Sequence, residues 1–146
     1  AVVIRFAYPF RARFAPKKDF VRKIIGQLSA GEKISMFADT VFTPTFIDDI
    51  AEAMKVILAK KPAGIFNVVG STSLSPFAAA CQVVRSFGLD ESLVEKQKLN
   101  DYLRIGSRPY PRYSWLSNQK LKVELGVSMR TFSESLFEMK RQLSFN

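Results

Sequence analysis

Apolar and polar positions along the chain follow periods that predict short buried strands separated by amphipathic helices. Residues 1–7, AVVIRFA, form a nearly continuous apolar and β-branched run, which is typical of a strand covered on both faces of a parallel sheet. GIFNVVG at residues 64–70 has the same character between two glycines, and KISMFAD at residues 33–39 is a shorter candidate strand. The pattern therefore predicts an α/β fold.

Several helices are predicted from an apolar stripe that lies between a capping residue and a terminating glycine. The segment LSPFAAACQVVRSFG has a serine cap followed by proline at the first helical position, and residues 131–134 have the spacing of a capping box. We expect no regular structure from residue 90 to residue 115. The predicted helix boundaries, in chain order, are Asp19 and Gly31, Ser75 and Gly88, Ser117 or Asn118 and Gly126, and Thr131 for the last helix.

Residues 41–60, VFTPTFIDDIAEAMKVILAK, predict an amphipathic helix entered through a stiff Thr-Pro-Thr step. Thr45 is the expected cap, and Asp48 is an acid in the first turn that favours the helix dipole. Asp49 is expected to point outward with Asp48. The expected inner positions are Phe46, Ile50, Ala53, Met54, Ile57 and Leu58.

Composition narrows the classes of function. The 146 residues suit one globular domain, and 47% of them are hydrophobic, without a run of about 18 apolar residues or a signal-peptide pattern. The single Cys81 suits a reducing, cytoplasmic compartment. Histidine does not occur, which argues against a catalytic triad and against a zinc site. Because the chain begins inside an expected buried strand, we expect it to be part of a longer protein.

A net charge of +9 favours an anionic partner, such as nucleic acid, an anionic membrane surface or a phosphorylated ligand. Arg5 lies in an expected buried strand, so we expect it to pair with an acid or to face a cleft. One basic loop contains Arg11, Arg13, Lys17 and Lys18. A second cluster interleaves Arg104, Arg108 and Arg112 with Tyr102, Tyr110, Tyr113 and Trp115. These clusters are either solvated surface and core cover, or groups that stack a base or sugar and neutralise phosphates.

Four segments, in this order, resemble the C-terminal half of the extended short-chain dehydrogenases/reductases of the NAD-dependent epimerase/dehydratase superfamily, in particular their dTDP-4-dehydrorhamnose reductase-like branch. They span most of the chain. The four segments are VIRFAY, FADTVFTPTFIDDIAEAM, GIFNVVGSTSLSPFAAACQVV and RPYPRYSWLSNQKLKVELGV.

The resemblance implies that residues 1–146 are a single fragment, with the last strands of a Rossmann-like sheet and a small, mostly helical substrate-binding domain. It implies a nucleoside-diphosphate sugar as ligand and NAD or NADP as cofactor, bound mainly by an N-terminal half of the same protein that this chain lacks. A homodimer is possible, and no membrane partner is expected. The expected substrate-binding residues are Tyr8, Arg11, Asp39, Phe42, Pro44, Thr45, Arg108 and Arg112.

The chain also departs from the resembled pattern. It contains neither the Gly-x-x-Gly-x-x-Gly phosphate loop nor the Tyr-x-x-x-Lys pair, so we expect the chain alone to be inactive and to bind no dinucleotide. Thr40 replaces the usual Gln, Phe42 replaces Gly or Arg, and Phe10-Arg11 replaces Tyr-Gly. Two alternatives remain open: a basic nucleic-acid-binding module, although no such motif occurs, and a non-catalytic regulatory relative of the same superfamily.

Overall fold

The computed structural model describes residues 1–13, 16–104, 106 and 108–144. The elements, in chain order, are β1 (Val2–Arg5), β2 (Pro9–Phe10), α1 (Phe20–Ser29), β3 (Ile34–Phe37), β4 (Val41–Phe42), β5 (Thr45–Phe46), α2 (Ile47–Lys60), β6 (Gly64–Asn67), α3 (Pro76–Phe87), the 3-10 helix η1 (Glu91–Leu93), β7 (Val94–Gln97), α4 (Leu99–Arg104), β8 (Tyr113–Ser114), α5 (Gln119–Leu125) and α6 (Phe132–Ser144).

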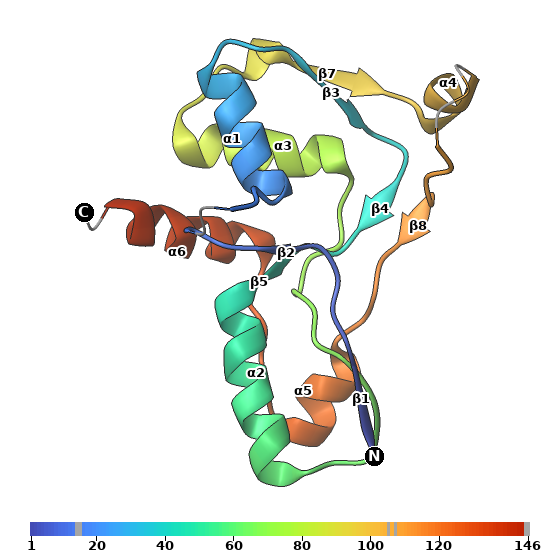
Figure 1. The fold of residues 1–146 in the computed structure, drawn as a ribbon, viewed down its shortest axis with the longest axis vertical. Helices are drawn as coiled ribbons and strands as arrows, with labels where there is room; N and C mark the ends of the chain where they lie inside the picture. The colour runs from blue at the N-terminus through green and yellow to red at the C-terminus, as the bar shows by residue number, and fades with distance from the viewer. Residues whose placement is uncertain (14–15, 105, 107, 145–146) are drawn as a thin grey trace.

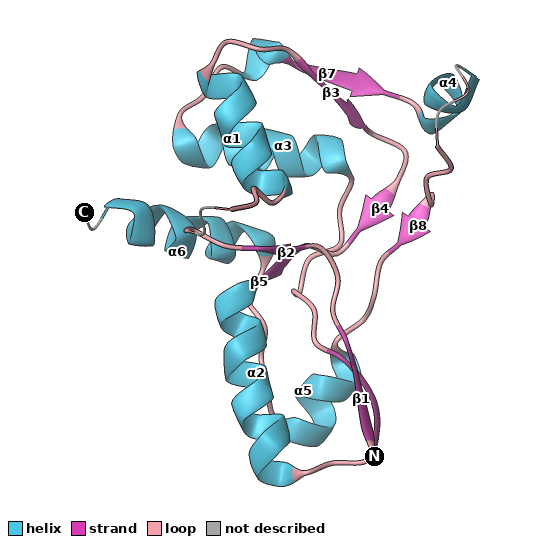
Figure 2. Ribbon diagram, in the orientation of Figure 1, coloured by secondary structure: helices cyan, strands magenta, loops and turns pink. Residues whose placement is uncertain are grey.

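The strands of the described residues form four short parallel pairs. β1 pairs with β6, β2 with β5, β3 with β7, and β4 with β8. Each pair joins segments that are far apart in the sequence, with helices between them (Figure 2). This arrangement confirms the predicted α/β class. Among the described residues, no helix combines the length and the apolar character needed to cross a lipid bilayer.

Two hydrophobic cores lie at opposite ends of the molecule (Figure 1). The first core is built from α1, α3, β3 and α6, around side chains such as Phe10, Ile24 and Phe132. The second core lies between α2, α5 and one face of the β1–β6 pair, around Ile57 and Phe66. Residues 41–46 run between the two ends, so their contacts determine how the cores are joined.

The capping signals that were predicted for α1, α3 and α6 are confirmed. Asp19 Oδ1 accepts a hydrogen bond from Arg22 N at 3.0 Å, and Ser75 Oγ accepts one from Ala78 N at 3.1 Å. The capping box before α6 has both of its reciprocal hydrogen bonds. Glu134 N donates to Thr131 Oγ1 at 3.2 Å, while Thr131 N donates to Glu134 Oε2 at 2.7 Å. Gly88 and Gly126 end α3 and α5 in the left-handed conformation.

The first strand is covered on one face only, which corrects the prediction of a strand buried on both. Ile4 packs on the second core, whereas Val3 and its register partner Ile65 are 49% and 45% exposed. Arg5 is exposed and has no ion pair with another described residue, because Asp49 pairs with Arg130 instead. A partner outside this chain, or a place facing a cleft, stays a prediction for Arg5. The β-branched run predicted a strand correctly, but it could not show which face is covered.

The segment from residue 90 to residue 115 is more regular than predicted. It contains β7, α4 and β8, because β7 adds to β3 and β8 adds to β4. These partners lie 60 and 72 residues upstream in the sequence, and short strands defined by such pairing carry little local signal. Tyr113 and Trp115 are exposed and do not cover the core. Leu58, an expected inner position of its helix, is exposed as well.

The helix α2 begins at Ile47 without a side-chain cap, which corrects the prediction that Thr45 is its cap. Thr45 lies in β5, and its Oγ1 accepts a hydrogen bond from Gly70 N at 3.2 Å instead. Asp48 lies in the first turn as predicted. The helix therefore starts where extended residues 41–46 end, and not at a capping hydroxyl.

Asp49 is buried and does not point outward as predicted. Its Oδ2 accepts a hydrogen bond from Arg130 N at 2.8 Å, and its Oδ1 forms an ion pair with the Arg130 guanidinium. Burial raises the pKa of Asp49, although its bonds to Arg130 act in the opposite direction. This pair joins the start of α2 to the residues before α6.

The loop after β6 approaches residues 43–45 so closely that only glycine fits at position 70. A Cβ atom on Gly70 would lie 2.3 Å from the carbonyl oxygen of Pro44. The Gly70 N–H donates a hydrogen bond to Thr45 Oγ1, and Ser71 N donates one to Arg130 O at 3.0 Å. The backbone of this loop is thus enclosed on two sides.

We predict that Gly70→Ala lowers the free energy of unfolding by about 3 kcal/mol, because the added methyl group collides with a backbone oxygen that is held in place. Gly26→Ala is the matched control, since its Cβ would meet only the flexible end of Lys18 at 3.2 Å and alanine favours the helix. Urea unfolding of both variants measures the difference. Equal stabilities would contradict the close approach.

We predict that Arg130→Met destabilises the protein by about 1–3 kcal/mol, less than a fully buried pair because the Arg130 side chain is 41% exposed. Asp49 then stays buried without its counter-charge. When the pKa of an acid is higher in the folded than in the unfolded protein, the protein loses stability as the pH rises through the unfolded pKa. The loss of Arg130 raises the pKa of Asp49 further, so the difference in the free energy of unfolding between variant and wild type should be larger at pH 7 than at pH 4. Lys55→Met, which removes an exposed pair on the same helix, should change little. A pH-independent loss would contradict this assignment.

Candidate functional site

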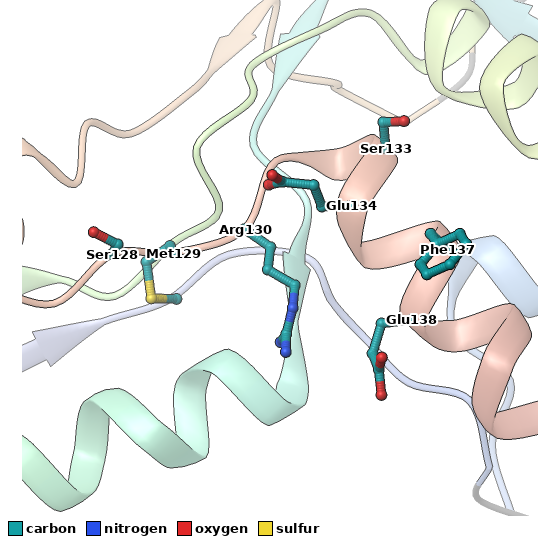
Figure 3. A pocket seen from close by; sticks show the side chains of 7 residues that line it. All are labelled: Ser128, Met129, Arg130, Ser133, Glu134, Phe137 and Glu138. Atoms are coloured by element: carbon teal, nitrogen blue, oxygen red, sulfur yellow. The ribbon is translucent and has the colours of Figure 1, made fainter.

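A hollow of about 540 Å³ lies beside the first turn of α6 (Figure 3). It contains none of the residues predicted from sequence. In Figure 3, the Arg130 side chain extends from the segment before α6 toward the start of α2. The residues that line this hollow are Ser128, Met129, Arg130, Ser133, Glu134, Phe137 and Glu138.

The charged groups of this hollow are already engaged within the protein. Arg130 pairs with Asp49, and Glu134 closes the capping box. Glu138 accepts hydrogen bonds from Arg141 and Gln142, and these bonds lower the pKa of Glu138 to about 2. The hollow therefore offers structural ion pairs more than groups for a ligand.

A second cavity, of about 200 Å³, is lined mainly by aromatic and aliphatic side chains, and none of the described residues in its wall is charged. We call it the aromatic cavity. It lies where the loop after β1 meets α1, β3 and β4. Its lining residues are Tyr8, Phe20, Ile24, Ser35, Met36, Phe37, Phe42, Pro76 and Tyr110.

Tyr8 enters the aromatic cavity from a backbone conformation that few residues adopt. Its φ is 44°, in the left-handed region, and a hydrogen bond from Thr45 N to Tyr8 O at 3.2 Å holds it there. The Tyr8 ring meets the edge of Phe42 with 4.9 Å between ring centroids. Its hydroxyl shares a long hydrogen bond of 3.4 Å with Ser114 Oγ. Such strain is often found where a side chain must be presented to a ligand.

Phe42 forms a rigid part of the cavity wall. Its backbone is bound on both edges, because β4 pairs with β8 on one side and bridges Leu74 on the other. The Phe42 N–H donates to Leu74 O at 3.0 Å, and Leu74 N donates back at 3.1 Å. The ring also contacts Phe20 edge-on at 5.2 Å. Substitution at this position would therefore change the shape of the cavity.

Tyr110 closes the cavity on the side of β3. Its ring lies 4.8 Å from that of Phe37, which also contacts Tyr102 at 5.2 Å. Burial, and then the neighbouring Tyr8, raise the pKa of Tyr110 to about 12. The phenol therefore stays protonated at neutral pH and can donate a hydrogen bond to a ligand.

Asp39 and Arg112, two predicted binding residues, are brought together as an ion pair beside the cavity. Arg112 Nη1 donates to Asp39 Oδ2 at 2.9 Å. Asp39 Oδ1 accepts from Leu99 N at 2.9 Å, and this bond, followed by those from Arg112, lowers the pKa of Asp39. A carboxylate held ionised in this way is poorly suited to act as a general base at neutral pH.

The remaining predicted residues lie outside the wall of the aromatic cavity. Pro44 and Thr45 are buried, and the Thr45 hydroxyl is bonded to Gly70. The Arg11 backbone N–H donates to Asp19 at 3.3 Å, and Arg108 is exposed two residues before Tyr110. Of the eight predicted residues, Tyr8 and Phe42 line the cavity directly. The roles of all eight as ligand contacts remain predictions.

Sequence reasoning did not assign Phe20, Ile24, Met36 and Phe37 to the site. Phe20 and Ile24 belong to the apolar stripe of α1, and Met36 and Phe37 belong to the short strand β3. A stripe of this kind predicts core packing, and nothing local distinguishes a core position from a cavity wall. Tyr110 was noted only as part of a basic and aromatic cluster.

A dinucleotide cofactor does not fit the described residues. Such cofactors need a glycine-rich turn between a strand and a helix N-terminus that faces the pyrophosphate. In the loop after β6, the carbonyl oxygen of Pro44 occupies the space beside Gly70 that a pyrophosphate would need. The N-terminus of α3 is capped by the side chain of Ser75. The loop after β1 contains Tyr8 and Pro9 in place of glycines.

Curated proteins of polysaccharide biosynthesis are similar to this chain. A probable low-salt glycan biosynthesis reductase of Haloferax volcanii is 25% identical over 146 residues, covering 99% of this chain and 48% of that protein. A spore coat polysaccharide biosynthesis protein of Bacillus subtilis is 27% identical over 127 residues, covering 86% and 43% respectively. The chain thus spans about half the length of the curated relatives that it matches.

Solved structures share the fold. A dTDP-4-dehydrorhamnose reductase of Bacillus anthracis, in complex with NADP, matches with a TM-score of 0.84 at 19% identity, over 97% of this chain and 48% of that one. A dTDP-4-dehydrorhamnose reductase of Clostridium acetobutylicum matches with a TM-score of 0.83 at 24% identity, over 99% and 49%. A dTDP-glucose 4,6-dehydratase of Bacillus anthracis matches with a TM-score of 0.75 at 17% identity, over 99% and 45%.

The sequence model of one family, described as the RmlD substrate binding domain, matches residues 1–145. This match covers nearly the whole chain, and the fold agrees with it. The chain therefore belongs to the RmlD substrate binding domain family.

Proposed function

We propose that the chain binds the nucleoside-diphosphate sugar of an NAD(P)-dependent reductase or epimerase, and that the aromatic cavity holds an uncharged ring of that ligand. The observation that carries this proposal is an aromatic cavity without a charged side chain, in a chain of a substrate-binding family. Its volume of about 200 Å³ is below that of a typical small-molecule pocket, so it suits one ring of a larger ligand.

The chemistry of the wall supports a planar or sugar ring as occupant. Tyr8, Phe42 and Tyr110 offer aromatic faces and edges, and the two tyrosine hydroxyls can orient polar edges of the ring. A diphosphate would have to lie outside this wall. Arg108 is exposed two residues before Tyr110, so we propose that its guanidinium contacts the phosphates at the rim.

We propose that the remaining chemistry belongs to a preceding part of a longer protein. A nicotinamide cofactor bound there would supply the hydride. A Tyr-x-x-x-Lys pair in that part would handle the proton, while the described residues bind and orient the sugar nucleotide. A reducing compartment such as the cytoplasm suits the buried thiol of Cys81.

The open face of the β1–β6 pair supports such a partner. Parallel strands are normally covered on both faces, and isolated two-stranded sheets are marginal. Here Val3 and Ile65 form an exposed apolar strip on one face, and Phe6 beyond β1 is 56% exposed. We propose that the preceding part of the protein covers this face.

Two further functions can be separated from this proposal by binding measurements. A nucleic-acid module would bind DNA or RNA with affinity that falls steeply with salt concentration, as phosphate contacts do. A regulatory relative of the same superfamily would bind the sugar nucleotide but would remain inactive when joined to its dinucleotide-binding part. The neutral wall of the aromatic cavity favours the sugar nucleotide over a polyanion.

We predict that the chain binds dTDP-sugars saturably in isothermal titration calorimetry, and that Tyr8→Ala weakens binding by about ten- to a hundredfold. The loss corresponds to one stacked ring of about 1–3 kcal/mol. Tyr110→Ala serves as a second variant, because Tyr8 also has a special backbone conformation. Phe137→Ala, which removes an exposed ring in the other hollow, is the control. Equal losses in all three variants would refute the assignment.

We predict that the chain alone does not oxidise NADPH with a 4-keto-sugar nucleotide, and that mixing it with a separately expressed dinucleotide-binding part restores activity. Val3→Thr with Ile65→Thr should reduce the recovered activity at least about tenfold while leaving sugar-nucleotide binding unchanged, because it makes the sheet face polar. Leu58→Thr, an exposed apolar position on α2, is the control. Turnover by the chain alone would contradict this division of labour.

A further inference from the structure

One carboxylate holds both ends of the segment that closes the aromatic cavity. Residues 98–112, of which the structure describes 98–104, 106 and 108–112, connect the end of β7 to the start of β8. Asp39 lies between β3 and β4. Its Oδ1 accepts a hydrogen bond from Leu99 N at 2.9 Å, and its Oδ2 accepts one from Arg112 Nη1 at 2.9 Å. Its backbone oxygen also accepts Arg112 Nη1 at 3.2 Å. The first and last parts of the segment thus meet at a single side chain.

Other bonds join the same two ends. Arg112 Nη2 donates to Asn100 Oδ1 at 3.1 Å, which links the return of the segment to its departure. Val41 N donates to Arg112 O at 2.9 Å, so the backbone at the return is fixed beside β4. Hydrogen bonds to an ionised group are stronger than neutral ones, and Asp39 supplies them at both ends.

The aromatic wall of the cavity lies between these ends. Tyr102 and Tyr110 both contact Phe37, and Tyr110 and Phe37 line the cavity. The position of Tyr110 therefore depends on where the 98–112 segment is held. Release of its ends would remove one side of the cavity, because Tyr110 belongs to the cavity wall.

We propose that Asp39 is a positioning residue for ligand binding, which holds both ends of the 98–112 segment and thereby keeps Tyr110 in the wall of the aromatic cavity. This inference rests on the proposed function of that cavity. In this inference Asp39 and Arg112 bind each other and do not contact the sugar nucleotide directly. The two assignments predict effects of opposite sign when Asp39 is replaced.

The first experiment compares Asp39→Ala and Asp39→Asn with Glu95→Gln in the 146-residue chain. Glu95 forms an exposed ion pair with Lys33 across the same β3–β7 pair, at 3.1 Å, but holds no part of the segment. We expect Asp39→Ala to raise the Kd for a dTDP-sugar by at least about threefold, because fewer molecules have a complete cavity. Asp39→Asn keeps one acceptor and should fall between Asp39→Ala and wild type, while Glu95→Gln should bind as wild type does.

The second readout is limited trypsin digestion, which separates local release from general destabilisation. Arg104 is exposed at the end of α4, and Lys60 is exposed at the end of α2 beside the other core. We expect Asp39→Asn to speed cleavage after Arg104 by about tenfold relative to cleavage after Lys60, because the opening of the segment becomes more favourable. Saturating dTDP-sugar should slow cleavage after Arg104 in the wild type and leave cleavage after Lys60 unchanged.

Three results would overturn the inference. If Arg112 contacts the diphosphate directly, Asp39→Ala frees its guanidinium and binding is unchanged or tighter. If Asp39 has only a general structural role, cleavage after Arg104 and Lys60 rises equally. Unchanged cleavage after Arg104 would show that Asp39 does not hold the segment. If the wild type binds no sugar nucleotide, the proposed function fails, and the digestion still decides whether Asp39 holds the segment.

Discussion

The close approach between Gly70 and Pro44 is the constraint on which the rest of the structure depends. The carbonyl oxygen of Pro44 occupies the space that a side chain at position 70 would need. Because of this approach, the Gly70 N–H reaches the Thr45 hydroxyl, and the loop after β6 rests on the extended residues 43–45. The loop follows β6, a strand of the second core, while residues 41–46 contribute Phe42 and Phe46 to the first core. This contact joins the two cores.

The extended residues 41–46 change partners at almost every step. Phe42 is bound by Leu74 and β8, and Thr43 Oγ1 is hydrogen-bonded to Ser73 at 2.8 Å and accepts from Leu116 N at 3.0 Å. Thr45 then meets Gly70 and the backbone of Tyr8. As a result, the two side chains that meet in the cavity wall, Tyr8 and Phe42, are positioned by one short stretch of backbone. A site built in this way does not need a ligand to assemble it.

Local signals predicted the helices well and the strand pairs less well. Ser75, Pro76 and Gly88 define α3, and Thr131 with Glu134 defines the start of α6, because capping depends on neighbours three or four residues away. The Thr45 cap was wrong because a buried N–H from Gly70, 25 residues downstream, takes its hydroxyl. Asp49 was placed outward because helical spacing cannot show that Arg130 lies beside it. Tyr8 and Phe42 were predicted as site residues through the family resemblance. Phe20 and Phe37 could be recognised as wall residues only from their neighbours in three dimensions.

Two hollows of the molecule therefore differ. The charges of the hollow beside α6 are engaged in holding the fold, whereas the neutral wall of the aromatic cavity is available to a ligand. The most direct measurement is a titration of the 15N-labelled chain with a dTDP-sugar, followed by backbone amide chemical shifts. The account predicts saturable shifts at Tyr8, Phe42 and Tyr110, with Ser133 and Phe137 unchanged. Shifts confined to Ser133 and Phe137, or no shifts at all, would contradict it.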